Sequence, residues 1–226
     1  MHNNDSFIDE VSEEVRRDKL FAGLRRYAWL ITALVVLLVG GAAVNEWLKL
    51  HRASRAETAG EAFRAAYAEP DPATRAADLG DLAASNARAA VLAKLAEAGA
   101  KAEAGDAAGA AALLGEVAGD GGAGELYRSL AALQRVMLLG ASMDASEREA
   151  TLELLVNPGA PFRPLALEQR ALMHLDAGDK PAAIADLEAV LAEPTASEAL
   201  LGRARQLIIA AGGTLPVPAA AVSADG

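Results

Sequence analysis

The sequence predicts an all-α protein, with one N-terminal transmembrane helix followed by an array of helical hairpins. Three observations predict this class. An uninterrupted apolar run stands near the N-terminus, glycines recur at a nearly constant spacing through the rest, and no stretch alternates apolar and polar residues as a strand does. The composition agrees, because alanine is abundant and aromatic residues make up only 4% of the chain, which favours closely packed helices over sheets.

The apolar run covers residues 27–44 and reads YAWLITALVVLLVGGAAV, without a charged residue. This length falls within the range of about 17–25 residues that a membrane-spanning helix needs. Trp29 and Trp47 stand near its two ends, as in an aromatic belt. A helix rises roughly 27 Å between them, close to the hydrocarbon thickness of a bilayer. We therefore predict a transmembrane helix over residues 27–46.

A cleaved signal peptide is the competing interpretation of this run. Gly41, Ala42 and Ala43 are small residues that suit a cleavage site. The preceding region is 26 residues long and rich in Asp and Glu, however, and the helical pattern continues beyond the run. Both features favour a retained anchor. Within it, Ala33, Gly40 and Ala43 share one helix face, which predicts a contact face for another transmembrane helix.

The basic residues on the two sides of the run predict its orientation. Five Lys or Arg residues precede it and four follow within residues 49–64, a small positive-inside bias. We expect a single-pass membrane protein, with residues 1–26 as a cytoplasmic tail and the C-terminal domain outside the cytoplasm. That helical domain is expected over residues 47–213, with a disordered Pro- and Ala-rich tail over residues 214–226.

The helical array is predicted from regularly spaced helix breaks. The first falls at Pro70, where Asp71 suits a helix N-cap and Pro72 a first-turn residue. The later breaks lie 35, 35, 38 and 34 residues apart, at Gly105, Gly140, Gly178 and Gly212. A period of this length with glycine as the helix stop is typical of helix–turn–helix repeats.

Two further helix starts are predicted from capping boxes of the form S/T-x-x-E, at Ser146–Glu149 and Thr195–Glu198. The glycine-rich segment 119–124 has no following Lys-Ser/Thr and no preceding strand, so it is interpreted as a turn and not as a phosphate loop.

The segment LEQRALMHLDAGDKPAAIADLEAVLAEP resembles a tetratricopeptide repeat. Ala171 stands where that repeat has a small residue in its first helix, and Gly178-Asp179 matches its turn. The second helix matches through these residues: Ala183, Ile184, Leu187, Leu191 and the closing Pro194. The unit around Gly105 matches more loosely, through Ala98, Ala110, Ala111, Leu114 and Val117. The unit around Gly140 departs from the pattern, because its second helix starts late, at Ser146.

The whole arrangement resembles a bacterial family, the ancillary Sec-translocon subunits with a tetratricopeptide-repeat-like periplasmic domain. The resemblance rests on the tail SFIDEVSEEVRRDKL, the single span and the divergent repeats, and it covers nearly the full chain. It implies a single-pass protein of the bacterial inner membrane, with a tetratricopeptide-like array in the periplasm beside the translocon. The implied protein partners are Sec-translocon subunits, periplasmic chaperones or folding factors, and emerging polypeptides.

Other function classes find no support in the composition. The net charge is −10, of which the first 26 residues contribute −1, so the remainder is too acidic to favour nucleic acid. There is no Cys, and His2, His51 and His174 are far apart and near no paired carboxylates. We predict no enzyme, no cofactor, no metal site and no small-molecule substrate.

A protein-binding surface on the first helix of each repeat remains as the predicted functional site. The repeat register places seven residues on it: Tyr127, Leu130, Gln134, Met137, Leu165, Glu168 and Leu172. The competing interpretation is that the Leu and Met residues here only close the core. A scaffold for an envelope machine, such as a division or wall-synthesis complex, is the alternative function for the same array.

Overall fold

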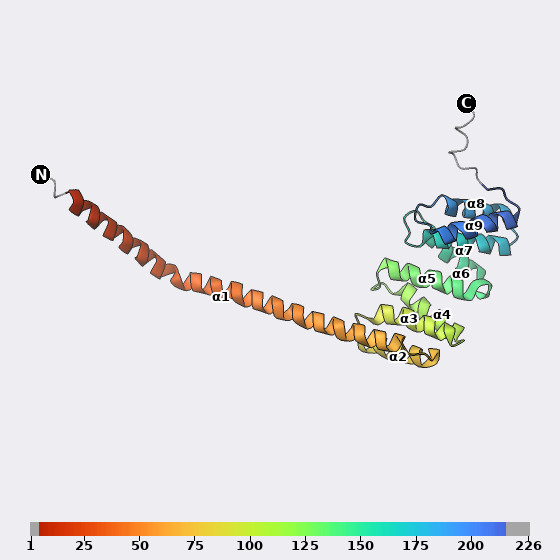
Figure 1. Cartoon of the computed structure of the whole chain (residues 1–226), viewed down its shortest axis with the longest axis horizontal. Coiled ribbons are helices and arrows are strands. Elements are labelled where there is room, and N and C mark those ends of the chain that lie inside the picture. The colour runs from red at the N-terminus through yellow and green to blue at the C-terminus, as the bar shows by residue number, and fades with distance from the viewer. Residues whose placement is uncertain (1–4, 216–226) are drawn as a thin grey trace, which may run out of the picture. The chain divides into compact units, whose positions relative to one another are not determined.

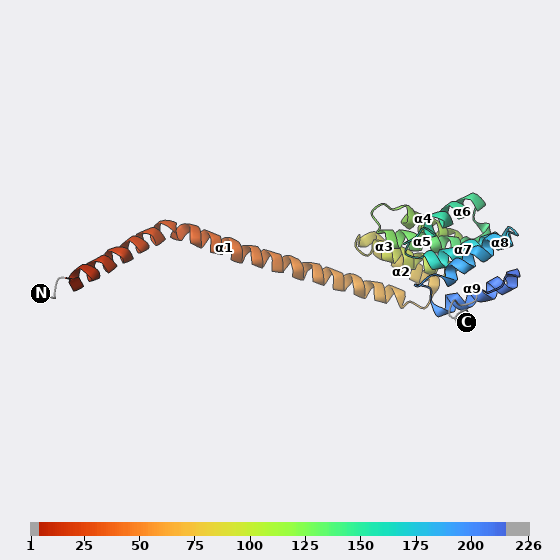
Figure 2. The same cartoon turned by 90° about the horizontal axis from the view of Figure 1, so that it is seen from above.

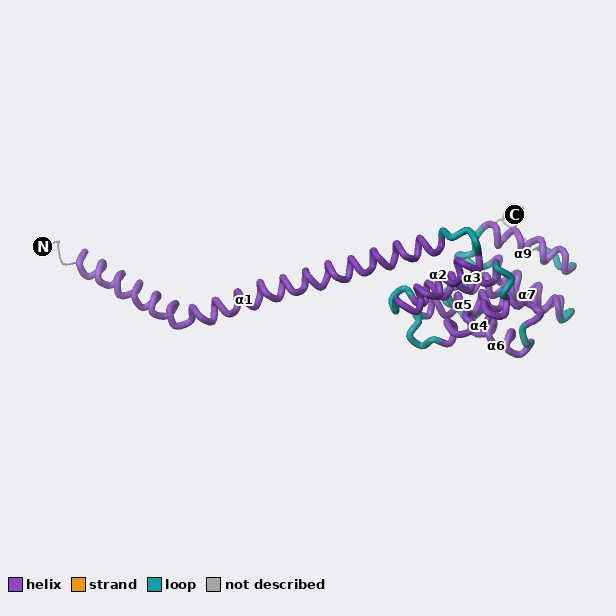
Figure 3. Tube along the Cα trace, turned by 90° about the horizontal axis from the view of Figure 1, so that it is seen from below, coloured by secondary structure: helices purple, strands orange, loops and turns teal. Residues whose placement is uncertain are grey.

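The structure is a computed structural model that describes the backbone of residues 5–215 and the side chains of residues 29, 30, 33, 34, 36–50, 54 and 56–215. Most of the predicted C-terminal tail, residues 216–226, lies outside the described part. The described backbone contains helices and no strand (Figure 3), which confirms the all-α prediction.

The helices follow one another with short connections in the order shown in Figure 1. Their bounds are α1 Asp5–Tyr67, α2 Pro72–Ser85, α3 Ala90–Glu103, α4 Ala107–Gly119, α5 Glu125–Leu139, the 3₁₀ helix η1 Gly140–Ser142, α6 Ala145–Leu155, α7 Arg163–Asp176, α8 Lys180–Leu191 and α9 Glu198–Ala211. The segment between α4 and α5 is a turn, as predicted for the glycine-rich stretch.

Contacts divide the chain into two units, Met1–Thr58 and Ala59–Gly226. In the first unit, the described part of the predicted span carries large apolar side chains that are all exposed, from 45% at Leu30 to 72% at Leu37. Five residues of that span have side chains outside the described part: Tyr27, Ala28, Ile31, Thr32 and Val35. Over the side chains described, no helix combines the length and the apolar composition that crossing a membrane requires. The transmembrane helix therefore stays a prediction.

In the second unit, a glycine with positive φ stands one or two residues after the end of each of α3, α5, α7 and α9. Gly105, Gly178 and Gly212 have φ of 87°, 79° and 89°, and Gly140 has φ of 50°. Residues with a Cβ rarely adopt this backbone conformation, so glycine stops the helix where the chain must reverse. The predicted helix breaks are confirmed at all four positions. From α2 to α9, each α-helix contacts the next one in the chain, and these helices pack together in Figures 1 and 2.

Aspartates begin most of the second helices. The Asp71 carboxylate accepts a hydrogen bond from the Thr74 amide at 2.8 Å, which confirms its predicted N-cap role. Asp106 and Asp179 accept equivalent bonds, at 2.8 and 3.1 Å, from amides three residues later. Each bond satisfies one amide that has no partner within its helix.

The two predicted capping boxes are wrong in register. Asp144 is the N-cap of α6 and accepts from the Ser146 and Glu147 amides at 3.0 and 3.1 Å, so Ser146 lies inside the helix. Ser197 is the N-cap of α9, and Thr195 lies in the preceding turn. A hydroxyl cap at Ser146 would accept from the amides of residues 148 or 149, whereas the helix begins earlier, at the carboxylate of Asp144.

The core of the second unit consists of three clusters of small and aliphatic residues. The first, at the end of α1 and in α2 and α3, is built from Ala66, Ala76, Leu79 and Ala100. The second joins α3, α4 and α5, and the third joins α5 to α9. α5 contributes Ala131 to the second and Leu133 to the third, so it connects the two larger clusters.

Candidate binding surface

One face of the second unit is made by the first helices of the hairpins. α5 contacts both α3 and α7, and α7 also contacts α9, although a second helix separates the members of each pair in sequence. This neighbour pattern is what stacked repeats produce, with first helices side by side along one surface. We call the surface formed by α3, α5, α7 and α9 the inner surface.

On α5, the four predicted residues follow one another at spacings of three or four, so they share one helix face. Met137 and Tyr127 are 54% and 40% exposed. Leu130 is half-buried and packs against the core cluster of α3, α4 and α5. Gln134 is half-buried too, and its Oε1 atom has no hydrogen-bond partner among the described residues.

On α7, the three predicted residues differ in burial. Leu172 is 36% exposed, whereas Leu165 is half-buried against the C-terminal core cluster. Glu168 is only 5% exposed. Its carboxylate accepts bonds from Nε and Nη2 of Arg203 on α9, at 2.7 and 3.0 Å. The carboxylate is therefore committed to the contact between α7 and α9.

The pairing of Glu168 with Arg203 also changes the acidity of the arginine. The hydrogen bonds that Arg203 donates to Glu168, and the charge attraction between them, raise the pKa of Arg203 above its usual value. The guanidinium stays charged, and the bidentate geometry holds α9 against α7.

Of the seven predicted residues, three are exposed: Tyr127, Met137 and Leu172. Leu130 and Leu165 pack against core clusters, which agrees with the interpretation that some of these residues close the core. The sequence reasoning did not include Leu126, which follows Glu125 on α5 and is 51% exposed, or Ile209 on α9, which is 60% exposed. Leu126 and Ile209 could have been predicted as surface residues because each is a large apolar residue near the end of a first helix.

The predicted contact face of the span lies in the first unit. Ala33, Gly40 and Ala43 are all exposed, and a Cβ built on Gly40 meets no atom within 4 Å. The face leaves room for the close approach of another helix.

Polar clusters able to bind a metal are not found in the part of the chain that the structure describes. His174 lies 3.6 Å from the Asp186 carboxylate, which is already bound by Arg170 at 2.6 and 2.9 Å. The side chains of His2 and His51 lie outside the described part.

Comparison with known proteins gives one match. The family described as tetratricopeptide repeat-like domain matches residues 24–208, well over half of the chain. No curated protein and no solved structure matches significantly. The matched region contains all the helical hairpins and also the apolar run. The chain therefore belongs to the tetratricopeptide repeat-like domain family.

Proposed function

We propose that this protein is a membrane-anchored adaptor that binds protein partners through the inner surface of its helical repeats. The observation that carries the proposal is the exposure of Tyr127, Met137 and Leu172 on the first helices of a tetratricopeptide repeat-like array. Aromatic and thioether side chains suit such a role, because they supply apolar area and adapt to different sequences. The proposed mechanism is binding without catalysis.

The anchor is the apolar run of α1. Its described large side chains, from Trp29 to Val44, are exposed on every side of the helix. A helix that is apolar all round needs an apolar environment, either a membrane or a protein core. The run has no charged residue in the sequence, which favours the membrane. We propose that the tail is cytoplasmic and the repeat unit periplasmic.

The place of action that we propose is the Sec translocon of the bacterial inner membrane. This part rests on the resemblance of the tail, span and divergent repeats to the ancillary translocon subunits. The partners are then translocon subunits, periplasmic chaperones and emerging polypeptides. Unfolded emerging chains expose apolar side chains, which matches the apolar character of Leu126, Tyr127 and Met137.

Cysteine labelling tests the topology, because the chain has no Cys of its own. Two single-cysteine variants are compared in intact spheroplasts with a maleimide that does not cross membranes: Ser142→Cys in the repeat unit and Ser12→Cys in the tail. We expect labelling of Ser142→Cys in intact spheroplasts and of Ser12→Cys only after lysis. Equal labelling of both in intact spheroplasts, or recovery of the protein away from membranes, would contradict the anchor.

Imaging separates the adaptor from the alternative scaffold role. A translocon adaptor is expected around the whole cell membrane, whereas a division scaffold gathers at midcell. A fluorescent fusion to the full chain that concentrates at midcell would therefore favour the scaffold and count against the proposal.

A further inference from the structure

We propose that a cleft between the end of α1 and α2 binds a basic amphipathic helix of a partner protein, independently of the inner surface. The cleft has a volume of about 760 Å³ and lies within the Ala59–Gly226 unit. That volume exceeds any single side chain, and the cleft is open to solvent, so a helix can approach it from outside.

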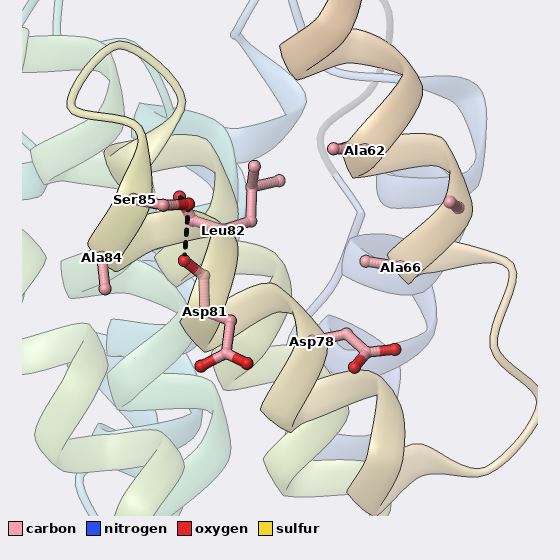
Figure 4. A pocket seen from close by; sticks show the side chains of 8 residues that line it. Ala62, Ala66, Asp78, Asp81, Leu82, Ala84 and Ser85 are labelled. Carbon is pink, nitrogen blue, oxygen red and sulfur yellow. Dashed lines mark hydrogen bonds between the residues drawn. The ribbon is translucent and has the colours of Figure 1, made fainter.

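The walls of the cleft are formed by small side chains. The cleft is lined by Ala62, Ala65 and Ala66 of α1 and by Leu82 and Ala84 of α2, and Figure 4 shows Ala62 and Ala66 pointing toward α2. Because alanine ends at Cβ, the space between the two helices stays unfilled above the core cluster that contains Ala66 and Leu79. An apolar groove between two helices is the geometry into which a third amphipathic helix docks.

The polar edge of the cleft is acidic. Asp78 and Asp81 line it from α2, together with Ser85, whose hydroxyl donates to the Asp81 carbonyl oxygen at 2.8 Å (Figure 4). No cation lines the cleft. Within the described side chains neither carboxylate forms an ion pair, whereas buried Glu168 and Asp186 and exposed Glu103 and Glu116 each bind a Lys or Arg.

This arrangement is unfavourable in the free protein. Asp78 and Asp81 are three residues apart on one helix, a spacing at which like charges repel. Asp81 also lies near the C-terminal end of α2, where the helix dipole disfavours negative charge, and α2 has no basic residue in its last turn. A Lys or Arg whose aliphatic stem lies on the alanines and whose head reaches the two carboxylates relieves both costs. Charge complementarity thus selects a basic partner.

The test uses the full chain in an uncharged detergent and two synthetic helical peptides. One peptide carries leucine along one face and lysine along the other; its twin has glutamate in place of lysine. Fluorescence anisotropy measures the affinity of each. We expect the lysine peptide to bind and the glutamate peptide not to bind. The double variant Asp78→Asn, Asp81→Asn should bind the lysine peptide with an affinity about tenfold lower.

The matched control is the double variant Glu125→Gln, Glu149→Gln. This variant changes the net charge by the same amount as the cleft variant. Both glutamates are exposed and lie outside the cleft, and the described part of the chain shows no ion pair for either. It should leave the affinity unchanged. Equal weakening by both double variants would overturn the proposal, because the attraction would then come from the overall acidic charge.

A third variant tests the shape of the cleft. Ala65→Leu fills part of the space without changing any charge, and Ala65 is exposed, so the fold should tolerate it. The lysine peptide should bind Ala65→Leu with lower affinity than the unchanged protein. In a separate variant, Ala84→Cys, a dye attached to this single cysteine should change its fluorescence when the peptide binds in the cleft. Unchanged affinity in Ala65→Leu would overturn the cleft as the site, without affecting the proposal for the inner surface.

Discussion

At the residue scale, glycine and aspartate set where the hairpins turn. Gly178 has a φ of 79°, and the next residue, Asp179, caps α8 through the Ala182 amide. Gly105 and Asp106 repeat the same pair at the turn into α4. The glycine supplies a backbone conformation that ends one helix, and the aspartate supplies an acceptor that begins the next.

The conformational role of Gly178 can be measured by replacing it with alanine. A Cβ at Gly178 meets no atom within 4 Å, so only the positive φ opposes Gly178→Ala. We expect a loss of about 1–2 kcal/mol in the free energy of unfolding, measured with urea.

The control for this substitution is Gly202→Ala. Gly202 lies inside α9 and also has open space around its Cβ position. Alanine there should stabilise the protein by about 0.5–1 kcal/mol. A stabilising effect at both positions would show that Gly178 is not held at positive φ in solution.

The caps also predict how stability depends on pH. Hydrogen bonds from the side chain of Ser146 and from the backbone of Glu147 lower the pKa of Asp144 below its usual value. A carboxyl whose pKa is lower in the folded state stabilises the fold above its unfolded pKa, near 4. That contribution is lost as the pH falls through the folded pKa. We expect Asp144→Asn to destabilise the protein more at pH 7 than at pH 2, measured by thermal unfolding at both. An equal loss at both pH values would contradict this role.

At the element scale, ion pairs between helices complement a core that consists largely of alanine and leucine. Asp186 on α8 is 6% exposed and accepts two bonds from Arg170 on α7. These bonds raise the pKa of Arg170. Without the charge on the Asp186 carboxylate, the partly buried guanidinium of Arg170 keeps one carboxylate partner among the described residues other than Asp186, the exposed Glu153, whose Oε2 lies 3.2 Å from Arg170 Nη1.

We therefore expect Asp186→Asn to lower the free energy of unfolding by about 2 kcal/mol. Asp176→Asn is the matched control, since Asp176 is 58% exposed and lies 3.4 Å from Arg148. It should change stability by less than about 1 kcal/mol. Equal effects of the two substitutions in urea unfolding would contradict a structural role for the Asp186 pair.

We expect the α5–α6 hairpin to be the least stable part of the repeat unit. α6 packs more sparsely against its neighbours than α2–α5 and α7–α9 do. Three buried polar atoms around it have no hydrogen-bond partner in the described residues: Gln134 Oε1, Arg135 Nε and Arg148 Nε. Each such atom costs roughly 1–3 kcal/mol. Hydrogen exchange should therefore be faster for the α6 amides than for those of α4 and α8; slower exchange in α6 would contradict this.

The sequence predicts those features of the helices that depend on residues close together in the chain. The helix breaks were predictable because glycine at a chain reversal marks its own position, as at Gly105 and Gly212. The caps at Asp144 and Ser197 were missed because several polar residues in each loop fit an N-cap. The burial of Glu168 was not predictable, since its partner Arg203 lies 35 residues away. Tyr127 and Met137 share one helix face, as helical spacing predicts, and both are exposed, while the binding of a partner there stays a prediction.

At the scale of the whole molecule, the proposed function depends on two features of one chain. The repeat unit offers exposed apolar residues on its first helices, and α1 carries an apolar run whose described large side chains are exposed. The tetratricopeptide repeat-like match begins at residue 24, so it includes both features. The proposal is that the first feature binds proteins and the second determines where it does so.

The most direct test of this claim is photo-crosslinking in cells from a photoreactive residue in place of Met137, with the same residue in place of Glu149 on α6 as the control. The account predicts products from position 137 that contain translocon subunits, periplasmic chaperones or emerging polypeptides, and few or none from position 149. Products from position 137 that contain only cytoplasmic proteins, or identical products from both positions, would contradict it.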